Sequence, residues 1–180
     1  VMDLIFTIVS SLKAGSRIRA NGIRITVNSE EEIDQFFNSL KNLKGLDANG
    51  QPTEDTAQMS GTITIDTMTY EKKLEYEALY PSFKIQANHL MCNIKFYSED
   101  GTNLLDEHIV EYGDAVTYLG SEQTKISTAQ YHFHFNGWSV EANSDGTNVY
   151  DGLDYITQSI TLYASFAREL RSYLIRFIDM

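Results

Sequence analysis

Apolar and polar positions alternate in two similar segments of the first half of the chain. Residues 22–27 read Gly-Ile-Arg-Ile-Thr-Val and residues 61–66 read Gly-Thr-Ile-Thr-Ile-Asp. Alternation with a period of two is typical of a strand with one buried face. A helical spacing of apolar residues follows each strand, over residues 29–40 and from Thr69 onward. The chain therefore begins with two strand–helix units, in which Gly61 is expected to correspond to Gly22.

Local signals mark the ends of these helices. Ser29 and Glu32 stand three positions apart before an apolar run, which predicts a capping box at the start of the first helix. The second helix should end before Pro81, because a proline disfavours the helical conformation in the residue that precedes it. The polar residues 47–59 contain turn signals and predict an exposed loop.

The pattern of the second half of the chain predicts strands joined by turns. Strands are expected at residues 93–98, 104–111, 130–138 and 159–167. Asp100-Gly101 between the first two is a strong hairpin signal. His132 and His134 alternate with Phe133 and Phe135, so the imidazoles should lie on one face of the third strand and the phenyl rings on the other.

The motifs of this half resemble the "bacterial repeat", a small β-grasp module of the Listeria–Bacteroides or internalin-B type. The residues that carry the resemblance are Asn93–Tyr97, Asp100–Thr102, Val110–Asp114, Phe133–Ser139 and Ile160–Phe166. The resemblance implies a β-grasp domain over 92–167 in which Trp138 packs in the core. We expect that core to contain Phe96, Phe135, Trp138 and Phe166. Phe135 and Trp138 can share a face only if the strand has a bulge or bend near Gly137.

The first half resembles degenerate leucine-rich repeats, on the pattern of residues 60–65 and 80–85. The expected fold class is α+β: a leucine-rich-repeat-like β–α domain over 1–88, then the β-grasp domain. Ile94-Lys95-Phe96 reappears as Ile175-Arg176-Phe177. Residues 171–180 are therefore interpreted as the first strand of a second repeat, and the chain as a fragment of a longer protein.

The acidic composition argues against nucleic acid and anionic membranes as binding partners. The net charge is −11 and the isoelectric point about 4.7, so the chain should be repelled by nucleic acid and by anionic membranes. Residues 1–12 are apolar but too short to span a membrane, and they predict a core helix or strand. The single cysteine, Cys92, cannot form an internal disulfide.

Candidate chemistry is sparse. His132, His134 and His108 could approach a metal ion, but without a nearby cysteine we interpret them as an ordinary half-exposed strand face. The pairs Glu99/Asp100 and Asp145/Asp151 do not have EF-hand spacing and fit turns instead. Trp138 as a sugar platform is the weaker interpretation beside Trp138 as core. We expect no catalytic, metal-binding or cofactor-binding residues and no bound cofactor.

These expectations point to a structural or adhesive module rather than an enzyme. The first interpretation is a component of a bacteriophage virion, in the tail, head fibre or baseplate, that presents or spaces host-binding parts. The alternatives are an internalin-like adhesin on a Gram-positive cell surface, and a carbohydrate-binding accessory domain of a cell-wall hydrolase. Expected partners are other virion subunits or a host-surface glycan or protein, with the chain itself in a homo-oligomer.

Overall fold

The chain divides into two units between Met91 and Cys92 in the computed structural model. The structure describes residues 19–42, 44–46, 52–56 and 58–177. The helix or strand expected at residues 1–12 lies outside the described residues. The described part has an α+β fold, with two helices and a six-stranded sheet in the order β1-β4-β5-β8-β7, in which β6 also pairs with β5. This agrees with the expected fold class at that level.

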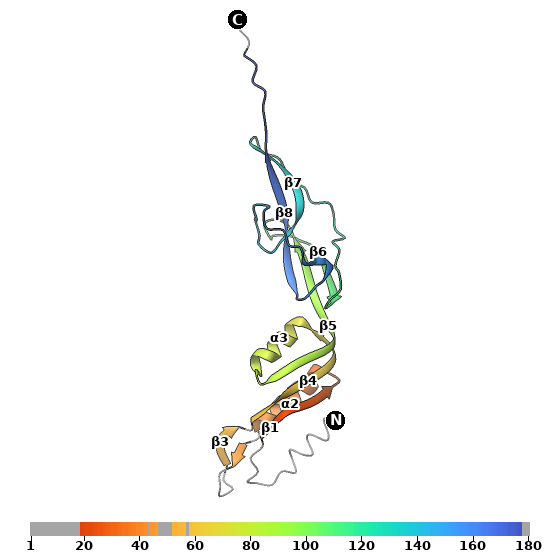
Figure 1. Cartoon of the computed structure of the whole chain (residues 1–180), viewed down its shortest axis with the longest axis vertical. Helices are drawn as coiled ribbons and strands as arrows, with labels where there is room; N and C mark the ends of the chain where they lie inside the picture. Colours follow the sequence, from red (N-terminus) through yellow and green to blue (C-terminus); the bar gives the residue numbers. More distant parts are fainter. Residues whose placement is uncertain (1–18, 43, 47–51, 57, 178–180) are drawn as a thin grey trace. The chain divides into compact units, whose positions relative to one another are not determined.

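Unit 1 alternates strands and helices (Figure 1). Its elements are β1 (Arg19–Val27), α2 (Glu30–Asn42), β2 (Lys44–Leu46), β3 (Pro52–Thr56), β4 (Gln58–Thr69), α3 (Tyr70–Leu79) and the first part of β5 (Phe83–Tyr97). β1, β4 and β5 lie side by side and run parallel. Parallel neighbours need a crossover connection, and α2 and α3 lie in the two crossovers.

The register of β1, β4 and β5 aligns one isoleucine from each strand. Ile25, Ile63 and Ile85 stand side by side on β1, β4 and β5. More residues separate Ile25 from Ile63 than separate Ile63 from Ile85. The reason is that the connection from β1 to β4 contains the β2–β3 hairpin in addition to α2. The predicted correspondence of Gly22 with Gly61 was wrong by one position, since Ile23 is the partner of Gly61. The register shifts between Ala20 and Ile23, where Gly22 has a φ of 72°.

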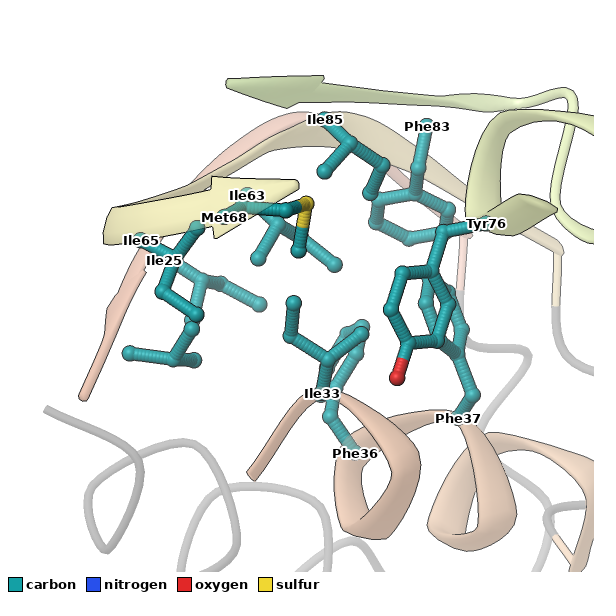
Figure 2. Packing of buried hydrophobic residues seen from close by; sticks show 11 residues of the cluster. Ile25, Ile33, Phe36, Phe37, Ile63, Ile65, Met68, Tyr76, Phe83 and Ile85 are labelled. Carbon is teal, nitrogen blue, oxygen red and sulfur yellow. The ribbon is translucent and has the colours of Figure 1, made fainter. Parts of the chain in front are cut away.

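Apolar side chains from all five principal elements of unit 1 form one core (Figure 2). The strands contribute the three aligned isoleucines, Ile25, Ile63 and Ile85. Helix α2 contributes Phe36 and Phe37, and α3 contributes Tyr76. The ring centroids of Phe37 and Phe83 are 5.3 Å apart, which joins α2 to β5. Both helices therefore cover the same face of the sheet, and the alternate residues of the strands lie on the other face.

The helix starts follow the predicted signals. The N–H of Glu32 donates to Ser29 Oγ over 3.3 Å, as a capping box requires. The reciprocal bond is displaced by one position, because Glu32 Oε2 accepts from the N–H of Asn28. Thr69 caps α3 by accepting from the N–H of Lys72 over 3.3 Å, and α3 ends at Leu79, before Pro81.

The exposed loop predicted at residues 47–59 is wrong in part. Pro52–Thr56 form β3, which pairs antiparallel with β2, and β4 begins at Gln58. The polar composition that indicated a loop is compatible with a short two-stranded ribbon, because strand pairing satisfies the backbone whatever the side chains are. Residues 47–51 and 57 of the predicted loop lie outside the described part of the chain.

Unit 2 contains the rest of β5, β6 (Leu104–Glu111), β7 (Tyr131–Ser139), the 3₁₀ turn η1 (Gly152–Asp154) and β8 (Ile160–Leu170). β5 pairs parallel with β8, and β8 pairs antiparallel with β7. The hairpin turn is where Asp100-Gly101 predicted it, since Gly101 has a φ of 75° and donates to the carbonyl of Ser98. The strands expected in this half all form, with ends that differ by a few positions.

Residues 171–177 form no strand within this chain. Leu174, Ile175 and Phe177 are 83%, 73% and 92% exposed. A strand needs a neighbour to satisfy its backbone and to cover its apolar face. The first strand of a second repeat, expected at residues 171–180, therefore stays a prediction that depends on a neighbour outside the described residues. Residues 178–180 lie outside the described residues.

Candidate functional site

An aromatic cluster around Trp138 contains the residues that the sequence predicts for the core of unit 2. The ring centroid of Trp138 lies 4.7 Å from that of Phe96 and 4.7 Å from that of Tyr118. Phe96, Trp138 and Phe166 are buried, with 0%, 5% and 5% of their surface exposed. Because only 5% of its surface is exposed, Trp138 offers no free face to a sugar.

Phe135 differs from the other three expected core residues. Its side chain is 37% exposed, although its ring centroid lies 5.4 Å from Trp138 and 5.9 Å from Phe166. β7 stands at the end of the strand order, with β8 as its one neighbour among the described strands. A residue on such an edge strand is covered from one side only, so Phe135 borders the cluster rather than filling it.

A bulge brings Phe135 and Trp138 to the same face. The register of β7 with β8 shifts between Phe135 and Gly137, so that Phe135 pairs with Phe166 and Trp138 with Ala164. Gly137 has a φ of 135°, a conformation that other residues rarely adopt. The break in alternation required near Gly137 is therefore present.

The aromatic row continues from the cluster along β7. Phe133 and Tyr131 alternate with the histidines, and their ring centroids are 6.3 Å apart. A cation lies over each ring: Lys125 Nζ is 4.6 Å from the Phe133 centroid, and the guanidinium of Arg168 is 5.4 Å from that of Tyr131. We name Tyr131, Phe133 and Phe135 the β7 aromatic row.

Lys125 is a residue that sequence reasoning missed. Besides facing Phe133, its Nζ forms an ion pair of 2.5 Å with Glu99 Oε1, at the β5–β6 turn. The pair joins the 112–130 segment to a turn much earlier in the chain. No local pattern signals such a contact, because Lys125 lies in a stretch without regular secondary structure.

The histidines are placed as alternation predicted. His132 and His134 are exposed on the face of β7 opposite Phe133, and His132 Nδ1 lies 3.1 Å from Ser127 Oγ. His108 contacts Asp106 instead, with 2.9 Å between Nε2 and Oδ2. Across the described residues, no three His, Cys, Asp or Glu side chains gather as a metal ion would require.

Two of the four carboxylates considered for calcium, Asp100 and Asp145, accept hydrogen bonds within their own turns. Asp100 Oδ1 accepts from Ser98 Oγ over 2.6 Å and from Thr102 N over 3.0 Å, and these bonds lower the pKa of Asp100 to about 2. Asp145 accepts from the hydroxyl and the N–H of Thr147, which lowers its pKa in the same way. Hydrogen bonds to the charged form favour it.

Unit 1 has a second surface of interest, the face of its sheet away from the helices. Here the register places Arg24, Thr62 and Lys84 in one row across β1, β4 and β5. The next row along the strands consists of Thr26, Thr64 and Gln86. Arg24 and Lys84 are exposed. We name these six residues the polar sheet face. On it, Arg24 of β1 and Lys84 of β5 lie on opposite sides of the Thr62 hydroxyl of β4.

Neither a protein-family model nor a curated protein matches this chain. Within the described part, neither helix is long and apolar enough to cross a membrane. What the two surfaces can do therefore follows from their chemistry: the polar sheet face can hydrogen-bond and attract anions, and the β7 aromatic row can stack or bury apolar groups.

Proposed function

We propose that the chain is a non-catalytic structural and adhesion module of a bacteriophage virion protein, in the tail, head fibre or baseplate. One observation carries the proposal: the strands of unit 1 are stacked so that equivalent residues of successive repeats stand side by side. Apolar residues form the inner ladder, and polar residues form the outer rows of the polar sheet face. Stacked repeats of this kind create extended surfaces that suit macromolecular partners.

The short step between β4 and β5, from Ile63 to Ile85, supports the resemblance of unit 1 to leucine-rich repeats. It falls within the range of that class, whose repeats have about 20–29 residues, each with a strand and a helix or 3₁₀ turn. The longer step from Ile25 to Ile63 is then a similar repeat that carries the β2–β3 hairpin as an insertion. The polar sheet face is the surface on which all repeats contribute equivalent positions, so it is our candidate for host contact.

The strand order of unit 2 supports its resemblance to the β-grasp bacterial repeat. Its first and last strands, β5 and β8, pair in parallel, and β6 and β7 flank them. The segment 171–177 supports a tandem arrangement. Ile175 and Phe177 are exposed, whereas the matching Ile94 and Phe96 are fully buried. In a following repeat, Ile175 and Phe177 would take the same core positions.

Binding to a host surface can be tested on the polar sheet face. Because Arg24 and Lys84 are cations, an anionic wall polymer is the appropriate probe. Purified Gram-positive cell walls that retain teichoic acid should bind the chain, and Arg24→Gln with Lys84→Gln should weaken binding about tenfold or more. The matched control is Lys72→Gln with Lys73→Gln on α3, which removes the same charge from the helical layer and should leave binding unchanged.

Two results would contradict the host-contact role of this face. One is the absence of binding to walls with teichoic acid and to walls from which it has been removed. The other is an equal loss of binding in both double variants, which would indicate a general effect of charge.

A separate experiment tests whether the protein is located in a virion or on a bacterial cell surface. Mass spectrometry of purified virions should detect peptides of this chain together with the capsid and tail proteins. Detection in a Gram-positive cell envelope, and not in virions, would replace the virion proposal by the surface-adhesin alternative.

The β7 aromatic row favours the third candidate, a carbohydrate-binding accessory domain. Stacking on sugars needs aromatic rings in a row on one accessible face, and Phe135 is partly exposed there. Saturable binding to a soluble wall glycan that is lost in Phe135→Ala, and kept in the polar-sheet-face variants, would support this function over host contact through unit 1.

A further inference from the structure

On β7, the backbone N–H and C=O groups of successive residues point alternately toward β8 and toward the outer edge of the sheet. Arg171 N donates to Gln130 O over 2.9 Å, so the pair 130/171 is of the hydrogen-bonded kind. Pairs alternate along an antiparallel ladder. The backbone groups of His132 and His134 therefore point toward β8, and those of Tyr131, Phe133 and Phe135 point away from it. This alternation continues up to the bulge between Phe135 and Gly137.

Contacts within the chain occupy both ends of this outer edge. Thr128 N donates to Tyr131 O over 2.9 Å, which confirms that the carbonyl of Tyr131 faces outward. Beyond the bulge, Tyr150 N donates to Trp138 O over 2.6 Å. Between these contacts lie the N–H and C=O groups of Phe133 and Phe135. The structure gives these four groups no hydrogen-bond partner among the residues it describes.

The side chains of β7 do not protect this edge. Exposed edge strands are usually guarded by charged residues, especially lysine, or by proline. β7 reads Tyr-His-Phe-His-Phe-Asn-Gly-Trp-Ser and contains none of these, although the whole chain has a net charge of −11. β7 carries no carboxylate, and the cations of Lys125 and Arg168 lie over Phe133 and Tyr131, so two copies of so acidic a chain can approach here without repulsion between carboxylates.

We propose that β7 pairs with β7 of a second copy of this chain, antiparallel and about a two-fold axis at His134. The sequence around this residue, Phe-His-Phe, is symmetric. Phe133 of each copy would stand opposite Phe135 of the other, and each such pair exchanges two N–H to C=O bonds. The four unpartnered groups of each copy are thereby satisfied. A two-fold interface uses the same patch on both subunits, which this symmetry allows.

The side chains support the same arrangement. Pairing would place Phe133 beside Phe135 of the partner on the apolar face and so cover the exposed part of Phe135. On the opposite face His134 would meet His134 of the second copy. This interface goes beyond the proposed function, because it needs neither a host surface nor a following repeat.

Sedimentation velocity over a wide range of concentrations, with the full chain, tests the pairing. We expect a reversible dimer whose dissociation constant rises about tenfold or more in His134→Lys, because two like charges then face each other across the axis. The control is Glu169→Gln, on the neighbouring strand β8 and opposite His132. It changes the net charge by the same one unit and should alter the dissociation constant less than about twofold.

Amide hydrogen exchange gives a second readout that does not depend on a variant. On dimerisation the amides of Phe133 and Phe135 should become protected, while those of His132 and His134, already bonded to β8, should change little. A chain that is monomeric at all concentrations would overturn the proposal. So would a dimer that His134→Lys leaves intact, or one that protects residues 173–177 and not Phe133 and Phe135.

Discussion

The rings of Phe135 and Trp138 lie with their centroids 5.4 Å apart, although the two residues are three positions apart on one strand. Strict alternation would place them on opposite faces of β7. The bulge at Gly137 reverses the alternation, so that one ring stands in the core and the other at its border. The stability of unit 2 should reflect this difference between the two rings.

Trp138→Ala should cost about 3–5 kcal/mol of unfolding free energy, as truncation of large buried aromatic residues does. Phe135→Ala is the matched comparison and should cost less than half as much, because its ring is already 37% exposed. Urea denaturation followed by far-UV circular dichroism measures both. Equal losses for the two variants would contradict the assignment of core and border.

Gly61→Ala should destabilise unit 1 by about 3 kcal/mol or more. A Cβ at this position would overlap the backbone carbonyl of Ile23 on β1, and backbone cannot move aside as a flexible side chain can. Gly22→Ala is the control: its φ of 72° is unfavourable for alanine, but a Cβ there meets no atom within 4 Å. It should cost about 1–2 kcal/mol, the usual penalty for a left-handed residue. A smaller effect at Gly61 than at Gly22 would show that the two strands are not in close contact there.

Lys125→Met should loosen the 112–130 segment while leaving the core intact. The substitution removes the ion pair with Glu99 and the cation over Phe133. Since the site is about one-third exposed, the loss should be about 1 kcal/mol. Amide exchange should accelerate at residues 121–130 and not in β5. Lys125→Arg, which keeps the charge, should lose less; unchanged exchange in Lys125→Met would show that other contacts hold the segment.

Tyr76→Phe should weaken the contact between α3 and α2. The hydroxyl of Tyr76 donates to Asp34 Oδ1 over 3.0 Å, and burial is the main reason that the pKa of Tyr76 is raised. Loss of a hydrogen bond to a charged group should cost about 1.5–3 kcal/mol. Tyr70→Phe on the same helix is the control and should change stability little. Thermal melts distinguish the two, and equal effects would contradict a specific role for the Tyr76 hydroxyl.

Acid should remove the contribution of Asp106 to stability. Its carboxylate accepts from the N–H of Leu119 over 2.7 Å, which is the main reason that its pKa is lowered. A carboxyl with a lowered folded pKa stabilises the fold above its unfolded pKa of about 3.9 and loses that effect as the pH falls through the folded value. Asp106→Asn should therefore be less stable than the natural chain at neutral pH, and the difference should shrink below about pH 4. A difference that is independent of pH would show that the carboxylate charge plays no part.

Much of the secondary structure could be predicted because its causes are local. Thr69 and Pro81 bound α3, and Asp100-Gly101 forms the predicted turn, since caps and turns depend on residues a few positions apart. The missed features depend on distant neighbours. The polar residues of β3 predicted a loop, and they form a strand only through pairing with β2. Phe135 was assigned to the core, but its exposure depends on which strands flank β7.

The two strand–helix units and the strands of the second half follow from the residues alone, whereas the bulge near Gly137 was expected only because the family resemblance places Trp138 in the core. Periodicity and backbone preference act over short distances, so they are visible without knowledge of the fold. The alignment of Ile63 with Ile85, the contact of Lys125 with Glu99 and the open outer edge of β7 emerge only in the folded chain. These features depend on which strands become neighbours, because pairing register and edge position are set by packing between segments far apart in the chain.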